Sequence, residues 1–172
     1  RDLRSKNQRI QILADTDKLT TLYNREKLDQ SLSDMLKTFI PEGKPLAMLI
    51  VDIDHFKRIN DEDGHLTGDK VLKGVASKLQ SRMREGDLLA RWGGEEFVVV
   101  LPYATLENAM DLADRLRLHI SEEMIEGKQV TVSIGVTQCE SIDTVESLFG
   151  RADKALYQAK LEGRDRVISA LI

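Results

Sequence analysis

Acidic side chains occur at two places in this sequence where a buried sheet does not need them. Asp52 and Asp54 follow the apolar run 46–51, and Glu95 and Glu96 follow a pair of glycines. A carboxylate at the end of an apolar strand is costly to place unless it is solvated, caps a helix or binds a cation. Each pair therefore has an ordinary explanation when taken alone: Asp54 caps the next helix, Asp52 ends a strand in solvent, and both glutamates are exposed at a turn.

Taken together, the two acidic segments predict a metal and phosphate site. A hairpin beside the first strand can bring Glu95 close to Asp52, and Mg²⁺ prefers one or two carboxylates together with phosphate oxygens. A helix that starts at His55 would point its free backbone amides toward the same place, and Lys57 lies on its first turn. Carboxylates for a metal, amides for a phosphate and a nearby cation are the groups that phosphoryl or nucleotidyl transfer requires.

Apolar periodicity predicts the elements that must position these groups. Helices are predicted directly after Asp54 and over residues 1–15, 25–39, roughly 68–83, 106–124 and 145–161. Strands are predicted over residues 46–51, 87–92, 97–101, 130–136 and 166–169. This order contains the β-α-β-β-α-β pattern of ferredoxin-like sheets.

The sequence also predicts the burial of two strands and the backbone conformation of one turn. The first strand is continuously apolar and should be buried on both faces, whereas the strand at 130–136 alternates and should be half-buried. Gly93 and Gly94 should permit positive φ angles in the turn between the second and third strands.

The composition is typical of one globular domain. The chain has 172 residues, of which 41% are hydrophobic and 31% charged, and its longest apolar run is too short to cross a bilayer. A net charge of -4 argues against a partner made of duplex nucleic acid, because such binders usually carry a basic excess. The single Cys139 cannot form a disulfide framework and the first residues contain no secretory signal, so we expect a cytoplasmic domain.

Residues 1–16 are expected to form a linker or stalk helix in front of a domain at 17–172. Leu3, Ile10 and Leu13 are apolar and regularly spaced, which suits either a dimerising coiled coil or a simple capping helix. A helix that begins in the middle of its pattern also suggests that an upstream part precedes it, such as a sensor domain or a membrane anchor.

Five motifs in order resemble the GGDEF family of bacterial diguanylate cyclases, in its GGEEF spelling. They are Asp17-Lys18-Leu19-Thr20, the segment Asp52-Ile53-Asp54-His55-Phe56-Lys57, Ile59-Asn60-Asp61 with Gly64-His65 and Gly68-Asp69, Arg91-Trp92-Gly93-Gly94-Glu95-Glu96-Phe97, and residues 152–164. They extend from Asp17 to about Val167, and five motifs in order are far more specific than any one of them. Lys18 and Thr21 stand where the family usually has Pro and Gly, so the first turn is expected to differ in shape.

The resemblance implies an α/β fold, an α+β sandwich with a five-stranded, mostly antiparallel central sheet flanked by helices in ferredoxin-like or palm-like topology. It implies that Asp52, Glu95 and the Ile53 carbonyl bind Mg²⁺, with Mn²⁺ as an alternative. Glu96 would serve as a second metal ligand or as a base. The implied catalytic residues are therefore Asp52, Glu95 and Glu96.

The same resemblance assigns the substrate site. Asn60 and Asp69 would bind the guanine edge, and His65 belongs to the same motif, with a structural role as its alternative. The phosphates would be bound by backbone amides and cations, with glycines beside them: His55, Phe56, Lys57, Gly93, Gly94, Lys160 and Arg164. On the residues alone, Lys160 and Arg164 suit a solvated helix face, and Asn60 suits a turn.

The implied reaction condenses two GTP molecules into cyclic di-GMP and releases two pyrophosphates. Each domain would bind one GTP, so a homodimer is needed to bring the two nucleotides together. Arg84 and Asp87 form an R-x-x-D motif that, with Arg115, would bind the product and inhibit synthesis. The alternative makes Arg84 a helix C-terminal cation and Asp87 a turn residue. A catalytically silent module that binds cyclic di-GMP, and a cyclase that makes a mixed dinucleotide, are the other functions considered.

Overall fold

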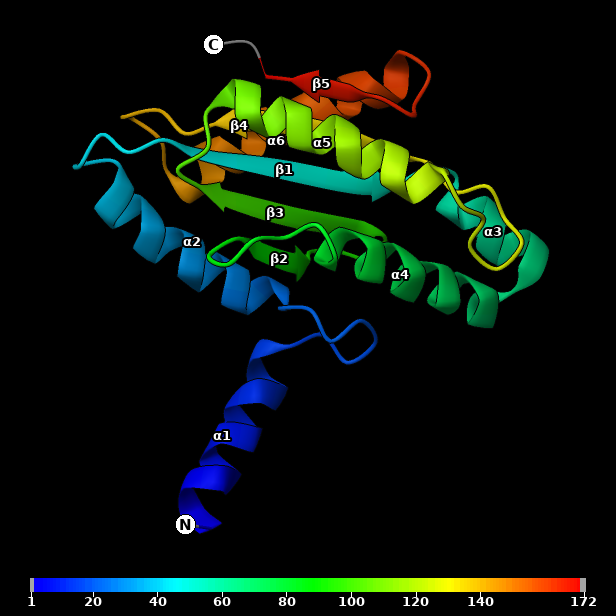
Figure 1. Cartoon of the computed structure of the whole chain (residues 1–172), viewed down its shortest axis with the longest axis horizontal. Coiled ribbons are helices and arrows are strands. Elements are labelled where there is room, and N and C mark those ends of the chain that lie inside the picture. The colour runs from blue at the N-terminus through cyan, green and yellow to red at the C-terminus, as the bar shows by residue number, and fades with distance from the viewer. Residues whose placement is uncertain (1, 171–172) are drawn as a thin grey trace.

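A five-stranded sheet in the order β2-β3-β1-β4-β5 forms the centre of the computed structural model, which describes residues 2–170 (Figure 1). The strands are β1 Leu46–Ile53, β2 Leu88–Arg91, β3 Glu96–Pro102, β4 Val132–Gln138 and β5 Val167–Ser169. The helices are α1 Asp2–Asp15, α2 Arg25–Phe39, α3 Phe56–Asp63, α4 His65–Gln80, α5 Leu106–Ser121 and α6 Val145–Leu161. β1 is antiparallel to both β3 and β4, β2 is antiparallel to β3, and only the β4–β5 pair is parallel within the described residues. The predicted fold class is confirmed.

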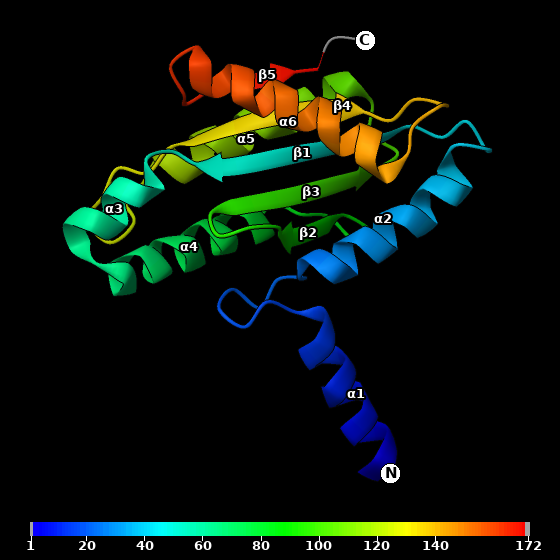
Figure 2. The same ribbon diagram turned by 180° about the vertical axis from the view of Figure 1, so that it is seen from behind.

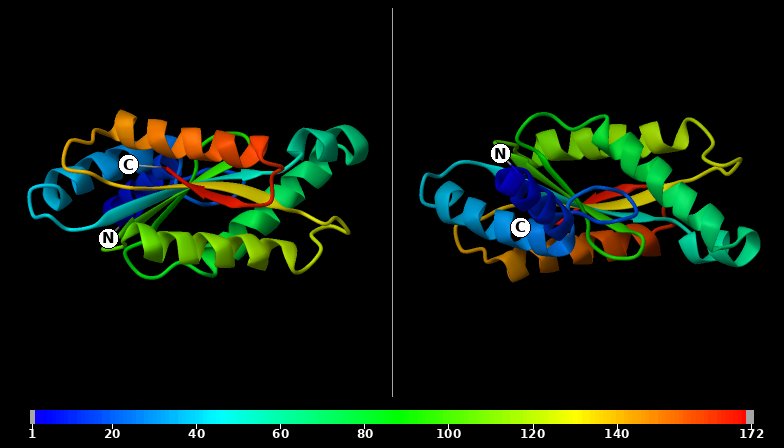
Figure 3. Two further views of the ribbon diagram at one scale, coloured as in Figure 1. Left: turned by 90° about the horizontal axis from the view of Figure 1, so that it is seen from above. Right: turned by 90° about the horizontal axis from the view of Figure 1, so that it is seen from below.

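Helices cover both faces of the sheet (Figures 2 and 3). The odd-numbered side chains of β1, from Ala47 to Ile53, pack in one core with residues of α4 and α5. The even-numbered side chains, from Leu46 to Ile50, pack in a second core with residues of α2 and α6. Successive side chains of a strand point to opposite faces, so a strand covered on both faces must be apolar throughout. This explains the uninterrupted apolar run of β1.

The β4 strand was expected to be half-buried, and this expectation is wrong. Its residues from Val132 to Thr137 are all buried, because α5 covers one face of the strand and α6 the other. Gly135 permits the close approach of α6: a Cβ atom at this position would lie 2.2 Å from the backbone oxygen of Ala152. The polar Ser133 is buried because it takes part in a hydrogen bond network at the end of β1, described below.

Capping residues explain where the helices begin. α2 and α6 have the predicted bounds, and each begins at a polar N-cap, Asn24 for α2 and Thr144 for α6. α4 begins at His65 rather than Gly68, because Gly64 adopts a φ of 87° and lets a new helix start directly after α3. α4 and α5 also end about one turn earlier than predicted. None of the helices within residues 2–170 combines the length and the apolar character that crossing a bilayer requires.

α1 projects away from the sheet and its covering helices (Figures 1 and 2). It buries no side chain, and Leu3, Ile10 and Leu13 are 79%, 64% and 70% exposed. Its last turn is tied to the rest of the chain by the Asn24 side-chain amide, which donates to the Ala14 carbonyl at 2.7 Å. The division at residue 16 stays a prediction.

Candidate active site

The register of the central strands brings the two acidic segments together. Asp52 on β1 is the direct partner of Glu96 on β3, and the backbone N–H of Ile53 donates to the Glu95 carbonyl at 3.3 Å. The two carboxyl groups are close enough for the charge of Asp52 to raise the pKa of Glu95. The Asp52 carboxylate is buried, with the whole residue 3% exposed. The predicted convergence of Asp52 and Glu95 is thus present in the geometry.

The turn that carries Glu95 differs from the expectation. The N–H groups of Trp92 and Gly93 donate to the Glu96 carbonyl at 2.8 and 3.3 Å, which closes the turn. Gly93 and Gly94 are not among the described glycines with positive φ, so the predicted reason for these glycines is wrong. A Cβ at Gly94 would meet no atom of this chain within 4 Å. The described structure therefore requires no glycine at this position on steric grounds.

Burial and mutual repulsion make the three carboxyl groups difficult to ionise together. Burial, and then the charge of Asp52, raise the pKa of Glu95 to about 7. Burial likewise raises the pKa of Asp52, although Lys160 opposes this effect. The pKa of Glu96 is raised by burial and by Asp52. Lys160 compensates in part, because its Nζ lies 3.0 Å from Asp52 Oδ2. Such a cluster gains stability from any further positive charge.

The donor atoms at this place suit a hard divalent cation. Within residues 2–170 no group of three or more His, Cys, Asp and Glu side chains is arranged to hold a metal ion. Carboxylate oxygens at this place would bind a cation together with water and substrate oxygens. Mg²⁺ is bound in this way in many phosphate-handling sites, whereas structural zinc sites use four protein ligands.

A cleft of about 460 Å³ opens beside the acidic cluster. The predicted residues that line it come from β1, α3, the hairpin and α6: Asp52, Ile53, His55, Phe56, Lys57, Glu95, Lys160 and Arg164. Asp54, Arg58 and Asp61 also line it and were not predicted as site residues. Asp54 and Asp61 belong to two of the recognised motifs, whereas the only signal for Arg58 is its exposed position on α3, one helical turn before Asp61. Glu96, Gly93 and Gly94 adjoin the cleft through the hairpin but are not among its lining residues.

The start of α3 provides backbone donors, but not in the expected way. His55 rather than Asp54 occupies the N-cap position, with a left-handed φ of 55° and no side-chain cap. The interpretation of Asp54 as an N-cap is therefore wrong. The amides that open α3 have no side-chain acceptor at the N-cap, and this end of the helix lies at the cleft that His55 and Phe56 line.

The predicted guanine-binding residues lie together where α3 meets α4. The Asn60 side chain lies so close to Gly68 that a Cβ there would be 1.8 Å from Asn60 Oδ1. Gly68 is therefore required for Asn60 to keep this position. Asp69 follows Gly68 on the same helix and is half-buried, whereas His65 is exposed at the start of α4. None of these three side chains is among the lining residues of the 460 Å³ cleft.

A second cavity, of about 620 Å³, contains the predicted R-x-x-D residues. Arg84, Asp87 and Arg115 all line it, together with Tyr103 and Asn108, which the sequence analysis missed. Arg84 Nε lies 3.1 Å from Asp87 Oδ1, and another Arg84 nitrogen donates to the Pro102 carbonyl at 2.5 Å. α4 ends at Gln80, so the alternative interpretation of Arg84 as a helix C-terminal cation is wrong.

The sheet topology and the acidic hairpin define a nucleotidyl cyclase domain of the GGDEF type. The sequence matches the family model described as "Diguanylate cyclase, GGDEF domain" over residues 14–166, and the chain belongs to this family.

Proteins of similar sequence include one named a diguanylate cyclase and one named a response regulator. The chain is 47% identical over 156 residues to diguanylate cyclase DgcP of Pseudomonas aeruginosa, covering 88% of this chain and 23% of that protein. It is 44% identical over 163 residues to response regulator PleD of Caulobacter vibrioides, covering 91% of this chain and 36% of that protein. The chain thus spans well under half the length of these two relatives.

Solved structures agree over the whole described fold, including α1. The coiled coil and GGDEF domain of DgcB from Caulobacter crescentus, in complex with c-di-GMP, superposes with a TM-score of 0.95 at 32% identity. That match covers 98% of this chain and 92% of the other. Diguanylate cyclase SiaD of Pseudomonas aeruginosa, in complex with its activator SiaC, superposes with a TM-score of 0.89 at 35% identity, covering 98% of this chain and 66% of the other.

Proposed function

We propose that this domain condenses two molecules of GTP into cyclic di-GMP. The observation that carries the proposal is the convergence of Asp52 and Glu95 beside Lys160 and the opening amides of α3. Family membership supports it, since the related proteins DgcP and DgcM are named diguanylate cyclases. The reaction needs little covalent chemistry from the protein, so positioning and charge stabilisation account for most of the catalysis.

The metal is the first element of this proposal. Asp52, Glu95 and the backbone carbonyl of Ile53 would hold Mg²⁺, or Mn²⁺ in its place, and the ion would neutralise phosphate charge. Lys160, which now compensates Asp52, would be free to interact with the phosphates once a cation is bound. Burial and Asp52 raise the pKa of Glu96, which makes it a stronger base for the proton of the attacking 3′-hydroxyl.

The substrate would extend from the acidic cluster toward the junction of α3 and α4. Lys57, Lys160 and Arg164 would bind the phosphates, together with the amides of His55 and Phe56. Asn60 and Asp69 would accept and donate hydrogen bonds at the guanine edge, with His65 nearby. Gly93 and Gly94 present no side chain on the hairpin, which would let the nucleotide approach its backbone closely.

Two copies of the domain are needed, because each would bind only one GTP. The attacking hydroxyl and the α-phosphate then come from different subunits related by a two-fold axis. The exposed apolar residues of α1 support a stalk that pairs with a second copy, and the DgcB structure similar to this one is described as a coiled coil with a GGDEF domain. Product binding by Arg84, Asp87 and Arg115 in the 620 Å³ cavity would limit synthesis.

Product analysis of the purified protein tests the proposal. Incubation with Mg²⁺ and GTP should yield cyclic di-GMP and two pyrophosphates, and Asp52→Ala and Glu95→Ala should each abolish turnover. The specific rate should rise with protein concentration, because the active species is a dimer. A protein that binds cyclic di-GMP but synthesises none would instead be a silent module. Mixed dinucleotides formed in the presence of ATP would identify a cyclase of broader specificity.

A further inference from the structure

The short turn that carries Arg164 has an unusual backbone. Gly163, Arg164 and Asp165 have φ angles of 120°, 65° and 44°, three left-handed residues in succession. Only the first is a glycine, and a non-glycine residue adopts this conformation at a steric cost. Arg164 nevertheless lines the cleft, as Lys57 does. Contacts from elsewhere in the fold must stabilise this turn.

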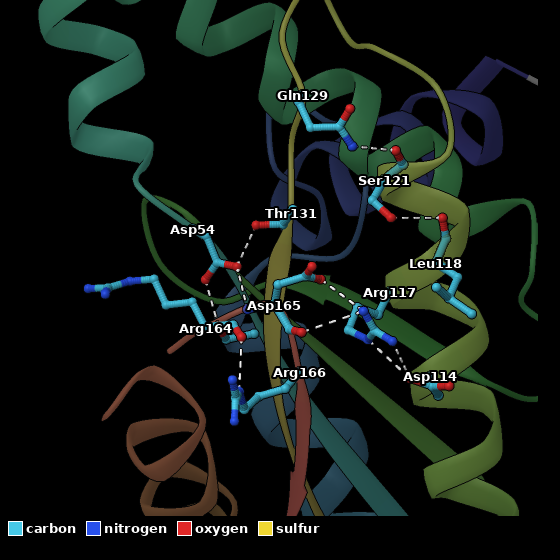
Figure 4. Close-up of polar contacts among 11 residues, drawn as sticks. Asp54, Asp114, Arg117, Leu118, Ser121, Gln129, Thr131, Arg164, Asp165 and Arg166 are labelled. Carbon is cyan, nitrogen blue, oxygen red and sulfur yellow. Dashed lines mark hydrogen bonds and ion pairs between the residues drawn. The ribbon is translucent and has the colours of Figure 1, made fainter. Parts of the chain in front are cut away.

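Asp54 provides the first of these contacts. Its carboxylate is buried, with the residue 5% exposed, and it accepts hydrogen bonds from the hydroxyls of Thr131 and Ser133 at 2.7 and 2.6 Å. Its third bond comes from the backbone N–H of Asp165 at 3.0 Å (Figure 4). Asp54 thus joins the end of β1, β4 and the turn after α6.

Arg117 on α5 provides the second contact. One guanidinium nitrogen lies 3.0 Å from Asp165 Oδ1, and another lies 2.8 Å from Asp114 Oδ1 on its own helix (Figure 4). The Arg117 side chain is only 19% exposed, so both ion pairs are partly shielded from solvent. Asp165 is therefore held on two sides, its N–H by Asp54 and its carboxylate by Arg117. Figure 4 shows the Arg164 side chain extending away from this network.

We propose that Asp54 and Arg117 are positioning residues that fix the turn at Asp165 so that Arg164 is held ready for the phosphates of the nucleotide. This inference rests on the proposed function, because it assigns the phosphates to Arg164. Arg117 does not line the nucleotide cleft, whereas Asp54 lines it and acts on Arg164 through its bond to the Asp165 N–H. Their contribution is to keep a turn in its left-handed conformation before substrate arrives, so that ordering of the turn does not oppose binding.

The Arg117→Gln variant tests the inference most directly, because Arg117 lies on α5 and is not among the residues that line the cleft. Loss of a charge-assisted contact at Asp165 should raise the KM for GTP about fivefold to tenfold, with kcat changed less than about twofold. Asp54→Ala, which removes the acceptor of the Asp165 N–H, should act in the same direction. It also removes a charge near Asp52, so Arg117→Gln gives the cleaner result.

Arg151→Gln is the matched control. Arg151 also bridges two acidic residues, Glu140 and Asp143, and its side chain is 23% exposed, but it lies in the second turn of α6 and does not line the cleft. This variant should lose thermal stability comparably and keep the wild-type KM. A purely structural role for Arg117 would give both arginine variants the same kinetic effect.

A double-mutant cycle with Arg164→Ala shows whether Arg117 affects the KM for GTP through Arg164. In the Arg164→Ala background, Arg117→Gln should raise the KM no further, because no guanidinium remains to be positioned. An undiminished increase in that background, or a wild-type KM for Arg117→Gln in the otherwise intact protein, would overturn the inference. If the wild-type protein makes no cyclic di-GMP, the proposed function itself fails, which is a separate outcome of the same experiment.

Discussion

The raised pKa of Glu95 predicts how the stability of the metal-free protein depends on pH. Burial and the neighbouring Asp52 raise this pKa from 4.5 to about 7. The folded state therefore binds the proton more tightly than the unfolded state does. The resulting stabilisation is complete below about pH 4.5 and is lost as the pH rises through about 7.

The size of the effect follows from the change in pKa. A rise from 4.5 to about 7 corresponds to about 3 kcal/mol between the two protonation states. The carboxyl group is partly exposed, so screening by solvent reduces the contribution to the free energy of unfolding to about 1–2 kcal/mol. For a chain of this length, that amounts to about 3–6 °C in the unfolding temperature.

Glu95→Gln isolates this contribution. The glutamine amide can donate to the Asp52 carboxylate as the protonated glutamic acid does, but it does not titrate. With EDTA present, the variant and the wild type should unfold at similar temperatures at pH 5, and the variant should be more stable by about 3–6 °C at pH 8. Mg²⁺ added at pH 8 should raise the unfolding temperature of the wild type and leave that of the variant almost unchanged.

Thermal unfolding followed by circular dichroism measures both effects. Comparison with the variant at each pH removes the contributions of the three histidines, which titrate in the same range in both proteins. Parallel pH curves for the two proteins would refute the assignment of the titration to Glu95. An equal response of both proteins to Mg²⁺ would refute Glu95 as a metal ligand.

Three further predictions concern other parts of the molecule. Gly135→Ala should lower the free energy of unfolding by about 1–3 kcal/mol, because the added Cβ would overlap the backbone of α6. Gly150 lies within α6 with open space around it, so Gly150→Ala should raise the free energy of unfolding by about 0.5–1 kcal/mol. Chemical denaturation measures both. Thr144→Ala removes the capping box of α6 and should cost about 1 kcal/mol in the same assay, and no change would show that the cap contributes little. Arg84→Ala should leave the initial rate of synthesis intact and raise the concentration of cyclic di-GMP needed to inhibit it; unchanged inhibition would exclude the 620 Å³ cavity as the product site.

Much of the fold follows from local sequence, because its signals depend on neighbouring residues. The apolar run of β1 requires burial on both faces wherever the strand is placed. The bounds of α2 and α6 follow from their polar N-caps, which act within one turn. The acidic pairs at Asp52 and Glu95 stand out because burying a carboxylate is unfavourable and neither a core strand nor a simple turn requires one.

Other features depend on partners far away in the chain, and no local pattern contains them. Asp54 looks like a helix cap, yet its hydrogen bonds come from residues 77, 79 and 111 positions away. β4 alternates like a half-exposed strand, yet two helices cover it. The register of β1 and β3 places Asp52 beside Glu96 and brings Glu95 close to Asp52. Burial raises the pKa of both Asp52 and Glu95, and the charge of Asp52 raises that of Glu95 further.

The sequence by itself thus determined the type of each element and which residue types were available for chemistry, because helix propensity, capping and strand alternation act over a few residues. Only the tertiary structure decided which carboxylates share a site and which of them instead hold a turn in place. Those outcomes depend on how strands pair and how closely helices cross the sheet, and the free energy of such contacts is set by atoms that are distant in the chain.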